Sequence, residues 1–304
     1  MTLRQLEVFL AIARERSFSR AAKKIHSSQP TLSEHVGELE RELDRKLFFR
    51  RGREVTLTEA GRVFAEYAGA ALAAVDGARQ ALAELDGLTH GSLLIGASTT
   101  PGIYVMPGVI ATFRQRYPGV ALTLRIANSQ VIEDRVKERE LDLGVVGGHA
   151  IGPGEECLAA GLLDELVIIV PPGHAWAKRR DIRPEALAGQ PLLVREEGSA
   201  TRRVTERALQ QAGVKSRVAM ELDHTEAIKQ AVLAGLGVAF VSTYAVRGEI
   251  ATGRLRAVRL RGVRVLRHFH VIHHEARRVT ASARAFMAVL AQTASRRPVP
   301  RHDC

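Results

Sequence analysis

Apolar residues recur at helical spacing along the start of the chain and predict three short helices joined by tight turns. The first helix carries Leu3, Leu6, Leu10 and Ala13 on one side. The second contains Ala21, Ala22 and Ile25 and can be capped by Ser19. In the third, which starts at Pro30 behind the natural cap Ser28, one stripe holds Leu32, Val36, Leu39 and Leu43.

The next two patterns predict a hairpin and a long helix. Residues 47–57, LFFRRGREVTL, are two apolar arms around a basic tip that contains Gly52. Thr58 then caps a helix that runs to about residue 86, with a heptad seam for which we expect a partner helix, the alternative being a single amphipathic core helix. The seam consists of Phe64, Ala68, Ala71, Val75, Ala78, Leu82 and Leu85.

After Gly87 short apolar strands alternate with helical stretches, which is typical of an α/β region. The predicted strands are residues 92–97, 120–126, 141–146, 165–170, 191–194, 218–222, 238–242 and 268–272. Two lobes connected by two crossings fit this order, lobe 1 at about 90–163 and 268–295 and lobe 2 at about 164–267. We therefore expect an all-α winged helix-turn-helix at 1–58, a linker helix at 59–87 and an α/β sensor region at 88–304.

Composition narrows the class of protein. The 304 residues are 46% apolar and 25% charged, which is ordinary for a globular chain of about two domains. No apolar run reaches the ~18 residues of a membrane span, and the start lacks a secretory pattern. Cys157 and Cys304 form neither a disulfide framework nor a metal spacing. We expect a soluble, cytoplasmic protein with no membrane contact.

The net charge of +11 favours a nucleic-acid partner only if the charge lies in the right place. Residues 1–60 hold 12 Lys and Arg against 9 Asp and Glu, whereas residues 251–304 hold 12 Arg against Glu275 and Asp303. Bulk charge therefore does not identify the DNA site. For the arginine-rich end, an Arg-biased surface or a frayed basic tail is favoured over a second nucleic-acid site.

Side chains suited to DNA stand on the outer face of the third helix and around the hairpin. Gln29 can pair with adenine, Pro30 can contact a thymine methyl, and Ser33 can bond either class of base, while Glu34 could accept from a cytosine amino group. Phosphate contacts are expected from the turn and from the wing arginines. The full predicted set is Ser27, Ser28, Gln29, Pro30, Thr31, Ser33, Glu34, Arg50, Arg51 and Arg53.

Three helix starts follow predicted strands, where an open α/β sheet binds its ligand. Hydroxyl and cationic side chains at two such starts, facing each other across a cleft, would suit a carboxylate or phosphate. Read singly, each start is more often an ordinary helix cap. The candidates are Ser98, Thr99 and Thr100 at the first start, Gly198, Ser199, Thr201 and Arg202 at the second, and His224 and Thr225 at the third.

Residues 17–61 resemble the DNA-binding segment of LysR-type transcription regulators almost throughout. The small pair Ala21-Ala22, Gln29-Pro30, Leu39-Glu40, Leu47-Phe48 and residues 57–61, LTEAG, match that family's pattern. Glu34 and His35 depart from it, standing where relatives often have a more basic pair. Residues 128–148 and 195–203 further resemble the branch with regulators of carbon fixation and sulfur assimilation.

This resemblance implies a paired linker helix and an effector region of periplasmic-binding-protein type. It also implies a homodimer, usually assembled as a homotetramer, on an interrupted DNA palindrome, and it leaves contact with the transcription machinery open. In the family, the strand-to-helix hydroxyls and the position of Asn128 line the inducer pocket. We expect a transcription regulator controlled by a small anionic metabolite bound between two lobes.

Two other classes of protein compete with a regulator. An enzyme is disfavoured because the sequence has no GxSxG elbow, no Walker loop and no GxGxxG after a strand. His273, His274 and Glu275 resemble the start of a zinc-protease motif, but Arg278 stands where the second histidine is needed. A solute-binding protein would need a signal peptide. No catalytic residue, metal or cofactor is therefore predicted, and a polar cluster explains His268, His270, His273 and His274.

Overall fold

The computed structural model describes residues 1–51, 54–85, 91–148, 155–275 and 279–295. It contains two compact units, Met1–Leu82 and a larger one that comprises Ala83–Glu275 and the chain from Val279 onward. Each unit has its own hydrophobic core.

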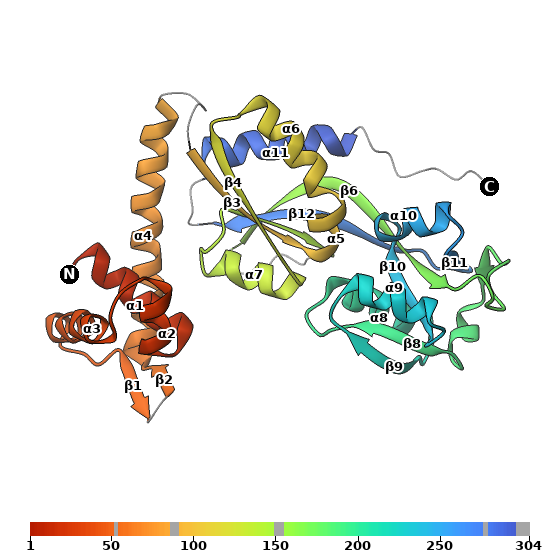
Figure 1. Ribbon diagram of the computed structural model, residues 1–304, viewed down its shortest axis with the longest axis horizontal. Helices are drawn as coiled ribbons and strands as arrows, with labels where there is room; N and C mark the ends of the chain where they lie inside the picture. The colour runs from red at the N-terminus through yellow and green to blue at the C-terminus, as the bar shows by residue number, and fades with distance from the viewer. Residues whose placement is uncertain (52–53, 86–90, 149–154, 276–278, 296–304) are drawn as a thin grey trace. The chain divides into compact units, whose positions relative to one another are not determined.

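The first unit is three helices, a hairpin and the greater part of a long helix, as predicted (Figure 1). Its elements are α1 (Leu3–Glu15), α2 (Phe18–Lys24), α3 (Gln29–Leu43), β1 (Phe48–Arg51), β2 (Glu54–Leu57) and α4 (Glu59–Leu85). The two strands pair antiparallel, with Phe48 opposite Leu57. This is a winged helix-turn-helix followed by a linker helix.

Aromatic side chains join the elements of this unit. The ring of Phe9 lies 5.2 Å from that of Phe48 and 5.0 Å from that of Phe64, so α1 packs on both the wing and α4. The predicted stripe of α1 was partly wrong, because the buried side is Leu6, Val8, Phe9 and Ile12, while Leu3 is 41% exposed. The predicted cap of α2 was also wrong. Ser17, and not Ser19, accepts from the N–H of Arg20 at 3.3 Å.

The seam of α4 is buried near the start of the helix and more exposed further along it. Phe64 and Ala68 pack into the core of the first unit, whereas Ala71 and Ala78 are exposed and Leu82 is 66% exposed. Val75 is half-buried, and the side chain of Leu85 lies outside the described residues. None of the described helices has a stretch long and apolar enough to cross a membrane.

The second unit is built on one mixed sheet with strand order β4-β3-β5-β12-β6-β10-β8-β9, to which β11 and β7 add at β6. The strands are β3 (Gly91–Ser98), β4 (Val120–Ala127), β5 (Leu143–Gly147), β6 (Glu155–Val170), β7 (Asp181–Ile182), β8 (Pro191–Arg195), β9 (Arg217–Leu222), β10 (Val238–Ser242), β11 (Arg256–Leu260) and β12 (Val265–His274). The helices are α5 (Thr99–Tyr104), α6 (Met106–Arg116), α7 (Ser129–Lys137), the 3-10 turn η1 (Pro184–Leu187), α8 (Ala200–Gln211), α9 (Thr225–Leu233), α10 (Thr243–Ala251) and α11 (Ala281–Ser295).

Two long antiparallel strands, β6 and β12, run through both lobes and connect them. In their register Asp164 lies opposite Arg267, and Leu163 lies opposite His268. The lobe boundaries expected from the sequence, 163/164 and 267/268, thus face each other across one pair of strands. The sequence pattern did not predict β7, β11 or the first half of β6.

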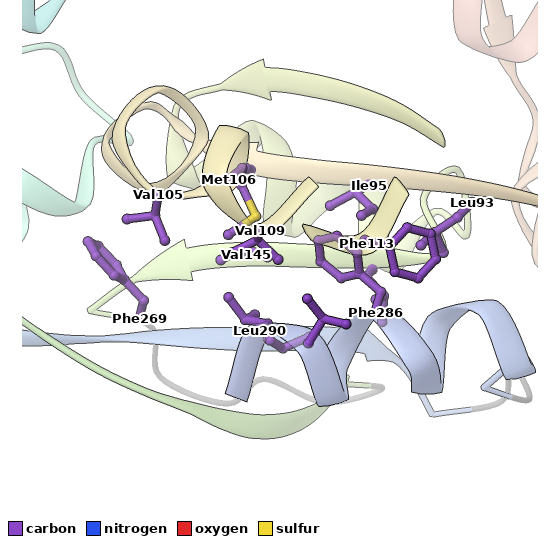
Figure 2. Packing of buried hydrophobic residues seen from close by; sticks show 14 of the residues in the cluster. Leu93, Ile95, Val105, Met106, Val109, Phe113, Val145, Phe269, Phe286 and Leu290 are labelled. Atoms are coloured by element: carbon purple, nitrogen blue, oxygen red, sulfur yellow. The ribbon is translucent and has the colours of Figure 1, made fainter. Parts of the chain in front are cut away.

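Helices cover both faces of the sheet in each lobe. In lobe 1, α6 and α11 pack on one face, where the rings of Phe113 and Phe286 lie 5.5 Å apart (Figure 2), and α7 packs on the other face through Ile132 and Val136. In lobe 2, α8 shares a core with Trp176, and α9 belongs to a separate core on the opposite side of β6. The helix starts after β3, β4, β8 and β9 therefore come to the carboxyl ends of parallel strands.

Candidate DNA-reading surface and effector site

The outer face of α3 presents the residues that sequence reasoning assigned to DNA. Leu32, Val36 and Leu39 are buried, which leaves the opposite face of the helix outward. Of the predicted contacts, Ser28, Gln29, Pro30 and Glu34 are exposed, and Ser27, Thr31 and Ser33 are half-exposed. Arg50 and Arg51 lie on β1, but their side chains, like Arg53, lie outside the described part of the chain.

Three of these residues already have side-chain partners within the protein, since the hydroxyls of Ser28 and Thr31 lie 2.7 Å apart. The hydroxyl of Ser28 caps α3 by accepting from the N–H of Thr31 at 3.2 Å. The Oε1 atom of Gln29 accepts from the hydroxyl of Ser19 at 2.8 Å. Since pairing with adenine uses the oxygen and nitrogen of the amide together, Gln29 would exchange Ser19 for the base on binding.

Polar side chains that belong to the family-like motifs fasten the wing to α3. The carboxylate of Glu40 is 9% exposed and accepts from the N–H groups of Leu47 at 2.8 Å and Phe48 at 3.3 Å. Thr58 caps α4 through the N–H of Gly61 at 2.9 Å and donates to the carbonyl of Lys46 at 2.6 Å. A Cβ atom on Gly61 would lie 2.1 Å from the carbonyl oxygen of Leu47, so only glycine fits there. These contacts fix the angle between recognition helix and wing.

A pocket lies between the two lobes at the carboxyl ends of β3 and β8, with about 190 Å³ of space that no atom fills, part of it open to solvent. We call it the interlobe pocket. It is lined by Ser98, Thr99, Thr100, Asn128, Ser129, Arg195, Ser199, Ala200, Thr201 and Arg267. Hydroxyls of both lobes therefore converge with two guanidinium groups.

Arg267 bridges the lobes inside this pocket. It is 5% exposed, and it donates to the hydroxyl of Thr100 in lobe 1 at 3.1 Å and to that of Thr201 in lobe 2 at 3.0 Å. Its charge is balanced by the fully buried Asp164, 2.8 Å away, which also accepts from Ser242 at 2.6 Å. Burial raises the pKa of Asp164, because desolvation outweighs the lowering effects of Arg267 and Ser242.

A second buried guanidinium, that of Arg195, makes a similar link. It donates to Thr99 of lobe 1 at 3.4 Å and to Thr225 of lobe 2 at 2.8 Å, and Glu196 balances its charge at 2.7 Å. At the same edge of the lobes, the N–H of Gln130 on α7 donates to the carbonyl of Gly198 at 3.1 Å. Gly198 has φ +84°, a left-handed conformation that glycine adopts without strain.

The polar N-cap residues that line the pocket differ in whether they cap their helices. Ser98 and Ser199 occupy the N-cap positions of α5 and α8, yet neither side chain accepts a hydrogen bond from its own helix. They are 5% and 4% exposed. By contrast Asn128, which also lines the pocket, caps α7 through the N–H of Val131 at 3.0 Å. The pocket therefore holds buried hydroxyls that the fold does not use as caps.

Four predicted effector residues do not line the interlobe pocket: Gly198, Arg202, His224 and Thr225. Arg202 pairs with Glu206 and Glu221 on the outer side of α8. His224 caps α9 by accepting from the N–H of Glu226 at 3.2 Å, and Thr225 reaches the pocket only through Arg195. Among the described residues, no group of three or more His, Cys, Asp or Glu is arranged to hold a metal ion.

Sequence reasoning missed the two pocket arginines and Asp164, although the strands carry a signal for two of the three. In β12, Val265, Arg267, Phe269 and Val271 are alternate residues on one face of the strand, and all are buried. In β6, Asp164 lies on the same face of the strand as the buried Leu162 and Leu166. A cation and an anion at inward positions of two strands indicate a buried ion pair. Arg195, at the end of β8, has no such signal.

Comparisons with known proteins agree with this architecture. Residues 3–62 match the family described as "Bacterial regulatory helix-turn-helix protein, lysR family", and residues 86–295 match "LysR substrate binding domain". The RuBisCO operon transcriptional regulator of Allochromatium vinosum is 36% identical over 298 residues, 97% of either chain. Full-length OxyR from Pseudomonas aeruginosa superposes with a TM-score of 0.73 at 26% identity, covering 97% of this chain and 94% of that one.

The regulatory domain of Synechocystis CcmR, whose structure was solved in complex with 2-PG, has a TM-score of 0.64 at 27% identity over 69% of this chain and 100% of that one. The two family matches leave little of the chain outside them, and they fall on the winged helix-turn-helix and on the two-lobed α/β unit. The chain belongs to the LysR family of DNA-binding transcription regulators and consists of a winged helix-turn-helix, a linker helix and an effector-binding domain.

Proposed function

We propose that this regulator is switched by a small anionic metabolite bound in the interlobe pocket. The observation that carries the proposal is the pair Ser98 and Ser199, two buried cap-position hydroxyls from opposite lobes that do not cap their helices. Together with the amino terminus of α8, a helix of 12 residues, they offer donors to a negative group. Arg195 and Arg267 add buried positive charge beside them.

We assign ligand contact to Ser98, Thr99, Thr100, Asn128, Ser199 and Thr201, with Gly198 shaping the lobe contact. Arg202 and His224 are engaged elsewhere, and Thr225 acts through Arg195. An anion that takes over the hydroxyls of Thr100 and Thr201 would replace the bridge now made by Arg267. Such an exchange biases the angle between the lobes and thereby the geometry of paired DNA-binding units.

On the DNA side, Gln29, Pro30 and Ser33 would supply sequence preference, while Ser27, Ser28 and the wing arginines would hold phosphates. A single unit with 12 cations against 9 anions in residues 1–60 makes few phosphate contacts. We therefore infer a homodimer through the exposed part of the seam of α4, assembled further as a homotetramer on an interrupted palindrome. Because the protein has to reach this DNA, we infer that it acts in the cytoplasm. Its role there is regulatory and not catalytic.

The relatives indicate the genes and the first effector to test. Several relatives are named as regulators of RuBisCO transcription, including one from Porphyra purpurea that is 38% identical over 276 residues, 89% of this chain and 87% of that one. CcmR was solved with 2-PG in its regulatory domain. We propose that this chain controls carbon-fixation genes and that 2-PG is its first candidate effector.

Thermal unfolding of the full chain with 2-PG or inorganic phosphate tests the pocket. A ligand at about 100 times its Kd stabilises the folded state by about 2.7 kcal/mol, so the wild type should show a clear rise in Tm. Thr100→Ala and Ser199→Ala should reduce that rise, whereas Thr112→Ala, whose hydroxyl donates to Gly108 on α6, should not. A full response in both pocket variants would place the ligand elsewhere, and no response to any of a panel of small anions would refute the anionic effector.

The separate roles proposed for base-contacting and phosphate-contacting residues can be tested by substitution. Gln29→Ala should lose preference between DNA sequences, whereas Arg53→Ala should weaken all sequences alike and flatten the dependence of affinity on salt. Binding titrations at several salt concentrations measure both. Equal loss of preference in the two variants would contradict the assignment.

A further inference from the structure

Two clusters of positive charge that are far apart in the sequence meet at one edge of lobe 2. Lys178, Arg179, Arg180 and Arg183 flank β7, and Arg254, Arg256, Arg259, Arg261 and Arg264 lie on and around β11. The two strands pair in parallel, so that the N–H of Arg259 donates to the carbonyl of Arg180 at 3.1 Å and that of Arg261 to Ile182 at 2.8 Å. These nine side chains form what we call the lobe 2 basic surface.

Carboxylates balance only part of this charge. Three acidic residues accompany the nine cations: Glu165, Asp181 and Glu185. Glu165 pairs with Arg259 at 2.9 Å and lies 4.0 Å from Arg264, and Asp181 pairs with Arg261 at 2.7 Å. The remaining six cations are all exposed, and in the described part of the chain none of them enters an ion pair: Lys178, Arg179, Arg180, Arg183, Arg254 and Arg256.

The backbone that carries the first cluster is anchored to the lobe. Trp176 is 6% exposed and packs into the core beside β6, with the ring of His174 edge-on at 4.9 Å. The N–H of Arg179 donates to the carbonyl of Trp176 at 2.8 Å, and that of His174 to Pro171 at 3.0 Å. A partner that binds here would not have to order the loop, which lowers the entropic cost of association.

We propose that the lobe 2 basic surface binds the phosphate backbone of duplex DNA. Eight of the nine cations are arginines, whose planar guanidinium matches phosphate geometry in two-point contacts. The lobe belongs to a chain whose residues 3–62 match a family of DNA-binding regulators, so duplex DNA is a partner of matching charge. The surface thus supplies backbone contacts that the small net charge of residues 1–60 does not.

Salt-dependent binding to mixed-sequence duplex DNA tests this proposal with the full chain. The triple variant Arg179→Gln, Arg180→Gln and Arg183→Gln removes three of the unpaired charges. Because each phosphate contact contributes about 0.9 to the slope of log K against log salt, the slope should flatten by up to about 2.7. The control Arg114→Gln, Arg207→Gln and Lys215→Gln removes equal charge from exposed positions outside the surface and should leave the slope near that of the wild type.

Unchanged Trp176 fluorescence and an unchanged Tm response to anions would show that the variant is folded and that its effector site is intact. A wild-type slope in the triple variant, or an equal flattening in the control, would overturn the proposal. If the triple variant keeps its DNA slope but loses binding to polyglutamate, the surface serves an acidic protein partner, and the assignment to DNA is wrong.

Discussion

Replacing Arg267 by methionine should destabilise the second unit more than any surface change. Arg267 and Asp164 form an ion pair whose side chains are 3% and 0% exposed, and Arg267 also bonds Thr100 and Thr201. Removing one partner of a buried pair costs about 3–5 kcal/mol, because the other charge is left uncompensated. Against a typical total stability of about 5–15 kcal/mol, this is a large fraction.

The double variant separates the pair from its surroundings. In Asp164→Asn/Arg267→Met both charges are gone, so the penalty for a lone buried charge disappears. We expect the double variant to be more stable than the sum of the two single costs implies, by about 3 kcal/mol of coupling. The hydroxyl of Ser242, which donates to Asp164 in the wild type, can donate instead to the amide oxygen that the Asp164→Asn substitution introduces.

The stability cost of Arg267→Met should also depend on pH. Burial already raises the pKa of Asp164, and Arg267 is one of the groups that lower it. Without Arg267 that pKa should rise further, and the carboxyl is then protonated and neutral at acidic pH. The cost of Arg267→Met should therefore be full and constant above this further raised pKa, and it should shrink as pH falls below it toward the pKa that Asp164 has in the wild type.

Urea unfolding followed by the fluorescence of Trp176 measures these free energies. Trp176 is the one tryptophan of the sequence and lies in the core of lobe 2, so it reports on the second unit. A cost below about 1 kcal/mol for Arg267→Met, the range of exposed ion pairs, or single costs that add in the double variant, would refute the buried pair.

Five further variants, at four positions, test the packing, DNA contact and pairing of the first unit. Gly61→Ala should cost about 1–3 kcal/mol through its clash with Leu47, whereas Gly69→Ala, whose Cβ meets nothing within 4 Å, should raise stability by up to about 1 kcal/mol; thermal unfolding followed by circular dichroism distinguishes them. Ser28→Asp should keep the cap of α3 and its stability but weaken DNA binding by charge repulsion, while Ser28→Ala should lose about 1 kcal/mol of stability; equal DNA affinity in both would argue against phosphate contact. Leu82→Glu, at a position 66% exposed, should dissociate the dimer in light scattering if the seam is paired, and an unchanged mass would contradict pairing.

The local sequence pattern was enough to predict the first unit and most strands of the second. The stripe of Leu32, Val36 and Leu39 and the cap Ser28 are local signals, and they occur as predicted. The cap of α2 shows the limit of such signals. Ser17 and Ser19 are both good caps, and the structure uses Ser17 because the helix begins at Phe18, whose side chain is buried in the core.

The arginines of the pocket illustrate what local patterns do not contain. Arg267 and Thr100 are 167 residues apart, and Arg195 and Thr99 are 96 apart, so their contacts depend on how the sheet brings the lobes together. The strand β11 was missed for a related reason. Its arginines suggested a solvent-exposed loop. In the structure the side chains of Val258 and Leu260 are buried and attach the strand to the core of lobe 2.

A DNA footprint upstream of the chain's own gene and its neighbours, with and without 2-PG, tests the central claim most directly. We expect two protected half-sites separated by an interval, with protection that changes on addition of 2-PG for the wild type and not for Ser199→Ala. Absence of sequence-specific protection, or the same ligand-dependent change in Ser199→Ala, would contradict a LysR-type regulator controlled through the interlobe pocket.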